Sequence, residues 1–459
     1  MDKNDEFIIQ GLAGEKKLHG AVIINGAKNS ALKAMAASIL FDGPVILENV
    51  PDNSDIQTMI SILEKMGAKI NVKEKSFTSF PASPEPQRAS KNSGGLILEI
   101  DATGINSTEI DPELATSMRA SIVLTGSLMG RFGKVSFPAP GGCVIGARPI
   151  DLFLSGYGKM GATVKEENDC LHKISAIDGL KGAEITFSKI SVGATETLMM
   201  AAVLAKGKTV LNNCAREPEI ANVAEWLNVC GANIKGIGTP TIEVEGTNGK
   251  LLSFKESFVT IPDRIEAGSF LILGALCAKK LKIEKCQPKH MNTVVKLLVE
   301  LGVNIKIEKD SIIVSASDFI NSTLPRSIKT LEYPGFPTDL QPPLVVFLTQ
   351  IKGQFSIRET IFEGRFKYVG DLIKMGANIT TINSREIKIK GPTPLHELSE
   401  NEELTAHDIR AGFALIVAAL IGNGKFTINN VHLIDRGYEK IEERLKILGV
   451  EIERTDKAR

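Results

Sequence analysis

The sequence predicts an α/β protein made of six copies of one βαβαββ unit, grouped as two lobes of three. Two observations carry this prediction. A Gly-Ala/Val-x-Ile/Val signature recurs six times, and a helix of small residues lies upstream of each copy. The chain of 459 residues is also long enough to bury a large core in two or three domains.

The repeated signature marks the end of one helix and the start of one strand in every unit. Each copy follows a helical pattern, as in residues 56–66, and its glycine suits a left-handed helix C-cap. The Ile or Val two residues further on begins a strand. After a first interval of 94 residues the signatures are 70 to 74 residues apart, which is longer than common solenoid repeats. The six glycines are Gly67, Gly161, Gly231, Gly302, Gly376 and Gly449.

A second helix, rich in alanine and glycine and apolar on most faces, is predicted upstream of each signature. This composition is typical of helices that are buried between close neighbours. A short strand follows most of these helices, as at residues 44–47 and 209–211. The predicted helices are residues 30–40, 115–128, 194–205, 266–278, 344–350 and 411–421.

The repeats also predict where the chain divides. The first lobe is predicted to comprise residues 26–260, and the second residues 1–25 together with 261–459, with the boundary near residues 257–263. The longer first interval includes residues 76–95, which contain Ser, Pro, Lys and Asn with little periodicity. We interpret this stretch as a solvated loop.

Composition excludes several classes of function. Lys+Arg and Asp+Glu both total 54, so no bulk positive field indicates nucleic acid or an anionic membrane. The six cysteines and six histidines lack the spacing of a metal site or a disulfide framework. Residues 1–7 lack a signal core, and the longest apolar runs are too short for membrane insertion. We therefore expect a soluble cytoplasmic protein with reduced thiols.

One thiol stands out from the others. Cys143 lies in a loop among Gly141, Gly142 and Gly146, five residues before Arg148. Glycines permit close approach to a ligand, and a nearby guanidinium favours the thiolate and binds carboxylate or phosphate. An inert loop thiol is the alternative, but these neighbours favour a reactive Cys143.

Polar residues precede the buried helices at comparable places in several units. Ser191, Asp339 and Asp408 are ordinary N-cap residue types, so capping alone is an equal alternative for each. Lys28 is not explained by capping. Helix N-termini attract phosphate and carboxylate, so two lobes with these ends facing inward would enclose an anion-binding cleft.

A second recurrence places arginine and glutamate side chains between a strand and the outer helix. It occurs at residues 215–219, 361–365 and 433–439. A single example would most simply be a local surface ion pair, worth about 0–1 kcal/mol. Its recurrence at one place in the unit favours the cleft instead.

The motifs of several other enzyme classes are incomplete or missing in this sequence. Gly141 and Gly146 have the spacing of a P-loop, but Ala147-Arg148 stands where the motif requires Lys-Ser/Thr. No GxGxxG motif between a strand and a helix and no GxSxG elbow is present. ATP hydrolysis, dinucleotide redox chemistry and serine hydrolysis are thereby disfavoured.

Taken together, seven segments resemble the UDP-N-acetylglucosamine enolpyruvyl transferases, the 1-carboxyvinyltransferases that begin peptidoglycan synthesis. The resemblance covers nearly the whole chain, and the order of the segments through six repeats makes it specific. It implies a two-domain inside-out α/β barrel with the active site in the interdomain cleft and no cofactor. The segments are residues 25–29, 118–121, 142–149, 191–195, 262–266, 333–339 and 434–439.

The resemblance implies a role for individual residues. Phosphoenolpyruvate would be held by Lys28, Asn29, Arg148, Arg365, Arg410 and Arg436. The nucleotide sugar would be held by Arg119, Arg148, Pro149, Ile150, Asp151, Leu152, Lys189, Ile190, Ser191, Val192, Gly193, Asp339 and Ile361. Catalysis would fall to Cys143, Asp339, Lys28 and Arg436, with Cys143 as proton donor and the target of the epoxide fosfomycin.

The chain departs from the family pattern in two places. Residues 76–95 and the N-terminal leader lengthen it, and Pro342 and Pro343 follow Asp339 closely. Two prolines are tolerated in the first turn of a helix, where N–H groups are unpaired. Two alternatives stay open: a transferase that uses shikimate 3-phosphate as acceptor, and a non-catalytic paralogue that binds a nucleotide sugar.

Overall fold

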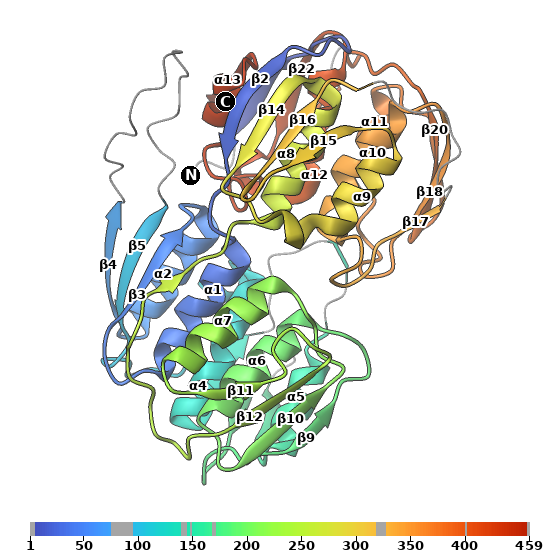
Figure 1. Cartoon of the computed structure of the whole chain (residues 1–459). Coiled ribbons are helices and arrows are strands. Elements are labelled where there is room, and N and C mark those ends of the chain that lie inside the picture. Colours follow the sequence, from blue (N-terminus) through green and yellow to red (C-terminus); the bar gives the residue numbers. More distant parts are fainter. Residues whose placement is uncertain are drawn as a thin grey trace.

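The computed structural model describes residues 5–74, 95–138, 145–146, 149–167, 171–317, 327–399 and 402–456. Two lobes, each with helices inside and small sheets outside, make up this part of the chain (Figure 1). Buried apolar residues fall into two separate cores, one drawn from residues 31–258 and the other from residues 7–24 and 265–452. The inside-out α/β architecture is therefore confirmed. The predicted lobe boundaries lie between these two cores.

The first lobe contains three units. The sheets of the first and third units each combine one parallel pair with antiparallel pairs, whereas both pairs in the sheet of the second unit are antiparallel. The first unit comprises β13 (Phe258–Val259), α1 (Lys28–Ala37), η1 (Ser38–Leu40), β3 (Val45–Val50), α2 (Ser54–Lys65), β4 (Lys69–Glu74) and β5 (Leu96–Asp101). The second comprises α3 (Pro112–Ser117), η2 (Arg119–Val123), α4 (Leu124–Phe132), β6 (Lys134–Pro138), α5 (Asp151–Lys159), β7 (Thr163–Glu167) and β8 (Leu171–Ser175). The third comprises β9 (Glu184–Thr186), α6 (Val192–Val203), β10 (Lys208–Asn212), α7 (Pro218–Val229), β11 (Asn233–Lys235) and β12 (Thr241–Glu245).

The second lobe repeats this plan. The fourth unit comprises β2 (Leu18–Ile23), α8 (Arg264–Cys277), β14 (Ala278–Glu284), η3 (Pro288–Met291), α9 (Asn292–Glu300), β15 (Asn304–Ile307) and β16 (Ser311–Ser315). The fifth comprises β17 (Ser327–Lys329), η4 (Thr338–Leu340), α10 (Gln341–Thr349), β18 (Gly353–Arg358), α11 (Val369–Lys374), β19 (Ile379–Asn383) and β20 (Glu386–Gly391). The sixth comprises β21 (Leu404–Thr405), α12 (Ile409–Ile421), β22 (Lys425–Asn429), η5 (Val431–Leu433), α13 (Ile441–Ile447), β23 (Ile452–Asp456) and β1 (Asp5–Gln10).

The first strands of the chain close the lobe formed by its C-terminal half. Strand β1 pairs antiparallel with β22 and β23, and β2 pairs parallel with β14. In Figure 1 the blue β2 lies beside the yellow β14. Conversely, β13 joins β3 in the first lobe. The chain therefore crosses between the lobes twice, once after β2 and once after β13.

The predicted helix caps are confirmed. All six signature glycines have a positive φ, between 86° and 109°, which L-residues with a side chain rarely adopt. Each closes the outer helix or outer-helix segment of its unit and is followed by the predicted strand. The regular spacing thus reports one conformation repeated six times.

The inner helices pack on one another at the centre of each lobe, α4 against α1 and α6, and α8, α10 and α12 against each other. One prediction was wrong in detail, because residues 115–128 do not form a single helix. Met118 is extended (φ −136°, ψ 110°), and it separates α3 from η2 and α4. Helix α10 begins at Gln341, so Pro342 and Pro343 occupy its first turn, as anticipated.

Candidate functional site

A lysine and an arginine from different lobes share one aspartate. The Lys28 Nζ lies 2.9 Å from Asp55 Oδ2, and the Arg436 Nε lies 2.9 Å from Asp55 Oδ1. Lys28 is the first residue of α1 and Asp55 lies in the first turn of α2, whereas Arg436 follows η5 in the second lobe. The lobe boundary therefore brings together two of the cations that the sequence predicted for anion binding.

The crossover between the lobes places Lys28. The N–H of Ala27 donates to the Ile261 carbonyl at 2.7 Å, and the N–H of Asp263 donates to the Asn25 carbonyl at 2.9 Å. A side chain at Gly26 would meet the carbonyl oxygen of Asn49 in β3 at 1.8 Å, so only glycine fits where the crossing segment passes this strand. Lys28 and the start of α8 are thus held side by side where the chain changes lobes.

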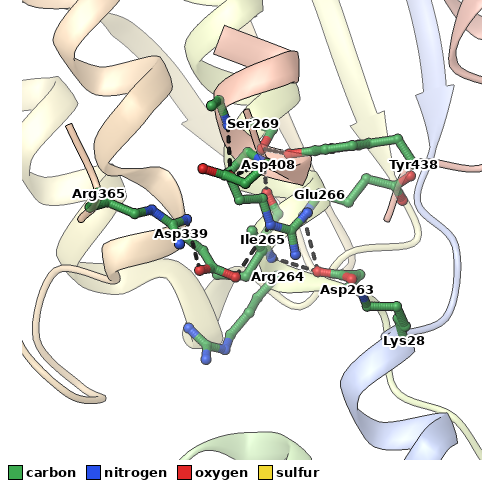
Figure 2. Close-up of polar contacts among 12 residues, drawn as sticks. Lys28, Asp263, Arg264, Ile265, Glu266, Ser269, Asp339, Arg365, Asp408 and Tyr438 are labelled. Atoms are coloured by element: carbon green, nitrogen blue, oxygen red, sulfur yellow. Dashed lines mark hydrogen bonds and ion pairs between the residues drawn. The ribbon is translucent and has the colours of Figure 1, made fainter. Parts of the chain in front are cut away.

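Asp339 is held by two buried arginines of its own lobe. Arg365 Nη2 lies 3.0 Å from Asp339 Oδ1, and Arg410 Nε lies 3.2 Å from Asp339 Oδ2. The Asp339 side chain is 28% exposed, against 2% for Arg365 and 5% for Arg410. Figure 2 shows Arg365 directed at Asp339. The two arginines fix the orientation of a carboxylate that still reaches solvent.

Arg410 connects the two clusters. Burial lowers the pKa of Lys28 from its ordinary value; Asp55 opposes this shift, while Arg410 and Arg436 add to it. Burial disfavours the charge on Arg410 itself, but Tyr438, Asp339 and Asp263 more than offset this and raise its pKa. The guanidinium also lies 5.1 Å from the centre of the Tyr438 ring. Lys28, Arg410 and Asp339 therefore belong to one electrostatic neighbourhood.

The polar residues ahead of the inner helices serve two purposes. Ser191 caps α6 by accepting from the N–H of Ala194, and Asp408 caps α12 by accepting from the N–H groups of Arg410 and Ala411. Both residues therefore act as N-caps, which was one of the two roles considered for them. Asp339 does not cap α10, and its oxygens accept from arginines instead. Asp339 is thus the predicted cap residue whose side chain accepts from arginines and not from backbone N–H groups.

The recurring arginine and glutamate segments connect a strand to the outer helix, as predicted, and they do not form local ion pairs with each other. Arg365 binds Asp339 and Arg436 binds Asp55. Glu363 binds Arg385. These partners are far away in sequence, which supports the cleft interpretation.

Most residues predicted to hold the nucleotide sugar lie in the first lobe. Arg119 opens η2 and is half-buried, Asp151 opens α5, and residues 149–152 are exposed or half-buried. Lys189 and Gly193 are exposed, and Ile190, Ser191 and Val192 between them are half-buried. The grouping of these residues with Asp339 around one nucleotide sugar stays a prediction.

Two further predictions concern residues of the second lobe and of the first crossover. The N–H of Ile361 donates to Glu359 Oε1 at 2.9 Å, so a backbone contact from Ile361 to a sugar would use its carbonyl oxygen. Asn29 is half-buried next to Lys28 in the first turn of α1. The contacts of both residues with substrate stay predictions.

Cys143, Arg148 and almost all of the loop at residues 76–95 lie outside the described residues. Two described residues between Cys143 and Arg148 reach the second lobe. The N–H of Gly364 donates to the Ile145 carbonyl at 2.8 Å, and Gly146 lies beside Glu363. This contact spans the two lobes close to Arg365.

The sequence did not predict Asp55, Asp263 and Tyr438 as parts of this site. Asp55 lies in the first turn of α2 and Asp263 is the N-cap of α8. Aspartate is common at both positions because it complements the helix dipole and the free N–H groups, so neither residue carries a distinguishing signal. Tyr438 follows Arg436 by two residues, and only its buried contacts with Arg410 and Ser269 reveal its place. The recurring segment at residues 433–439 was the one available clue.

The described ranges contain neither a candidate metal site nor a membrane-spanning helix. His, Cys, Asp and Glu side chains there form no group of three that could hold a metal ion. Within the same ranges no helix combines the length and apolar character needed to cross a bilayer.

Comparisons with known proteins agree on the family of folds. The family model of EPSP synthase (3-phosphoshikimate 1-carboxyvinyltransferase) matches residues 12–104 and 97–445. The solved structure of the enolpyruvyl transferase NikO from Streptomyces tendae superposes with a TM-score of 0.84, at 23% identity and 99% coverage of both chains. EPSP synthase from Acinetobacter baumannii superposes with a TM-score of 0.71, at 17% identity, covering 98% of this chain and 100% of that one.

Curated relatives are much closer in sequence. UDP-N-acetylglucosamine 1-carboxyvinyltransferase from Koribacter versatilis is 41% identical over 98% of this chain and 96% of its own length. UDP-N-acetylglucosamine 1-carboxyvinyltransferase 2 from Listeria monocytogenes is 40% identical, with 99% of both chains covered. These two relatives, which are about 40% identical over nearly the whole chain, are both named UDP-N-acetylglucosamine 1-carboxyvinyltransferase. The solved structures are less similar in sequence and establish the fold.

Proposed function

Because the chain belongs to the UDP-N-acetylglucosamine 1-carboxyvinyltransferases, a family of enolpyruvyl transferases, we propose that it transfers the enolpyruvyl group of phosphoenolpyruvate to the 3-hydroxyl of UDP-N-acetylglucosamine. The products are inorganic phosphate and the enolpyruvyl ether of the nucleotide sugar. This is the first committed step of peptidoglycan synthesis, and the proposal places it in the cytoplasm, with no cofactor. The supporting observation is the cation cluster of Lys28, Arg410 and Arg436 next to the arginine-held Asp339.

The reaction is an addition followed by an elimination. In the proposed first step Cys143 gives a proton to the methylene carbon of phosphoenolpyruvate, which leaves cationic character on the adjacent carbon. The sugar 3-hydroxyl then forms a C–O bond to that carbon, and Asp339 takes the hydroxyl proton. In the second step the new methyl group returns a proton to the Cys143 thiolate as the C–O bond to phosphate breaks, and the proton held by Asp339 leaves with the phosphate. The double bond is restored and phosphate leaves.

The proposed roles of the charged residues follow from where negative charge lies. Lys28, Arg436 and Arg148 bind the phosphate and carboxylate groups, and they stabilise the phosphate as it becomes a leaving group. Arg365 and Arg410 line the same cleft. Their contacts with Asp339 suggest that they also keep the base pointed at the acceptor hydroxyl. A base must lie within about 3 Å of the proton that it takes, so a fixed Asp339 favours reaction.

The test of this function is the release of phosphate from phosphoenolpyruvate. With UDP-N-acetylglucosamine as acceptor we expect steady turnover, and with shikimate 3-phosphate we expect none. Relatives at about 40% identity carry the nucleotide-sugar name, which disfavours the shikimate acceptor. A non-catalytic paralogue would bind the nucleotide sugar without releasing phosphate. The absence of release with both acceptors would therefore contradict the proposal.

The loop thiol gives a second prediction. Fosfomycin is expected to inactivate the enzyme irreversibly by alkylating Cys143, because a thiolate near Arg148 opens the epoxide. Cys143→Asp should keep an acid at this position and escape inactivation. Mass spectrometry of the treated protein should locate the adduct. Cys170→Ser is the matched control and should be inactivated like the wild type; inactivation of Cys143→Asp at the wild-type rate would refute the role of Cys143.

A further inference from the structure

Asp55 is a buried carboxylate that the proposed reaction does not use. Its side chain is 8% exposed, and each oxygen accepts from a different cation, Lys28 of the first lobe and Arg436 of the second. We propose that Asp55 is a positioning residue that holds these two cations together as one anion-binding pair across the lobe boundary. This inference rests on the proposed function, because it assigns Lys28 and Arg436 to phosphoenolpyruvate.

The charges support a positioning role. Burial alone would raise the pKa of Asp55, but Lys28 and Arg436 overcome this and bring its pKa below the ordinary value. Asp55 is therefore ionised near neutral pH. In return it opposes the burial that lowers the pKa of Lys28. A lysine that binds an anion must be protonated, so Asp55 sustains the charge on which Lys28 depends.

One carboxylate takes a hydrogen bond from each cation. Asp55 accepts one of the three donors of the Lys28 ammonium group and one of the five of the Arg436 guanidinium. Because both bonds end on one carboxylate, the separation of the two cations is set by its geometry. Lys28 and Arg436 otherwise belong to separate lobes, and no covalent connection fixes their spacing.

The surrounding contacts also join the lobes at this point. The N–H of Asp52 donates to Glu439 Oε2 at 3.0 Å, and the N–H of Ser54 lies 3.5 Å from the Asp435 carbonyl oxygen. Asp435 is in turn held by Arg454 at 3.0 and 2.6 Å. The start of α2 is thus docked on residues 435–439, which places Asp55 within reach of Arg436.

Asp55→Asn tests the inference, because it keeps the size of the side chain and removes its charge. We expect kcat/KM for phosphoenolpyruvate to fall on the order of 10- to 100-fold, the cost typical of removing an outer-shell partner of a ligating group. Most of the loss should lie in KM for phosphoenolpyruvate, while KM for the nucleotide sugar changes little. If Asp55 only joined the lobes, its replacement would change KM for both substrates and not for phosphoenolpyruvate alone.

The pH profile provides a second readout. Lys28 must be protonated to bind the anion, so kcat/KM for phosphoenolpyruvate falls as pH rises through the pKa of Lys28. Asp55 raises that pKa, and its removal should move the alkaline limb of the profile to lower pH. Asp55→Glu keeps the charge with one more methylene group. It should leave the limb near the wild-type position while lowering kcat/KM.

Asp111→Asn is the matched control. It removes the carboxylate of another lysine–aspartate pair in the same lobe, where Asp111 lies 2.8 Å from Lys65 and both side chains are more exposed. Asparagine should still cap α3 there, so activity and pH profile should match the wild type.

Binding of phosphoenolpyruvate, measured by calorimetry without the nucleotide sugar so that no turnover occurs, separates the two hypotheses. A wild type that binds phosphoenolpyruvate but releases no phosphate once UDP-N-acetylglucosamine is added would sink the proposed function alone. Equal affinity and an unmoved alkaline limb in folded Asp55→Asn would overturn the role of Asp55. If Asp55→Asn does not fold, Asp55→Glu provides the test. An Asp55→Glu variant that displaces the alkaline limb as well as lowering kcat/KM would overturn the role of Asp55.

Discussion

Asp339→Asn is expected to lower kcat by about 10²- to 10⁴-fold, the range that a positioned general base contributes. The amide retains the shape of the side chain and an oxygen that can accept from one arginine, but it cannot take the proton of the sugar hydroxyl. Arg365 and Arg410 would each lose one counter-charge, so we expect some loss of stability as well. The rate of phosphate release at saturating concentrations of both substrates measures the effect.

The control for Asp339 is a second arginine-bound aspartate of the same lobe. Asp5 in β1 lies 3.2 Å from Arg454, and Asp5→Asn should leave kcat unchanged. Calorimetry should show that Asp339→Asn still binds the nucleotide sugar, since one hydrogen-bonding oxygen remains. A variant that turns over within a few-fold of the wild-type rate would show that another group accepts the proton.

Lys28→Met is expected to reduce kcat/KM for phosphoenolpyruvate on the order of 10²- to 10³-fold, as removal of one preorganised donor to developing negative charge does elsewhere. Methionine fills a similar volume without charge, and Asp55 would keep Arg436 as its remaining partner. Lys28→Arg should not restore activity, because a planar guanidinium cannot replace a compact ammonium group in a buried site. Initial rates over a range of phosphoenolpyruvate concentrations give this value.

Lys33 supplies a matched control on the same helix. Its ammonium lies 3.4 Å from Glu196, and both side chains are buried, as in the pair formed by Lys28. Lys33→Met should therefore lower the temperature of unfolding, because it leaves Glu196 without its cation. It should not change KM for phosphoenolpyruvate. An equal loss of kcat/KM in both variants would mean that Lys28 acts through stability alone.

Local structure followed the sequence closely because its causes are local. A glycine in the left-handed conformation ends a helix wherever it occurs, and all six signature glycines have this conformation. The inner helix of the second unit departs from the prediction, since Met118 is extended. Alanine-rich composition favours a helix on average, but it does not show where a single residue leaves it.

The sequence did not predict which partners the buried charged side chains bind. Residues 194–205 were predicted as a small-residue helix, and Glu196 within it has a pKa that burial raises to about 7 despite Lys33. Helical periodicity places such a residue on a face, but it does not identify a partner on another helix. The same holds for Arg365 and Arg436, whose neighbouring glutamates in sequence are not their partners in space.

Short-range periodicity and the order of the motifs sufficed to predict the repeated unit, its caps and the family. Tertiary packing set which strands complete which unit, since β1 and β2 join the second lobe and β13 joins the first. It also decided that Asp55 joins Lys28 to Arg436 and that two arginines hold Asp339. Such contacts form between residues far apart in the chain, and the packing of the two lobes selects them from many equivalent charged pairs.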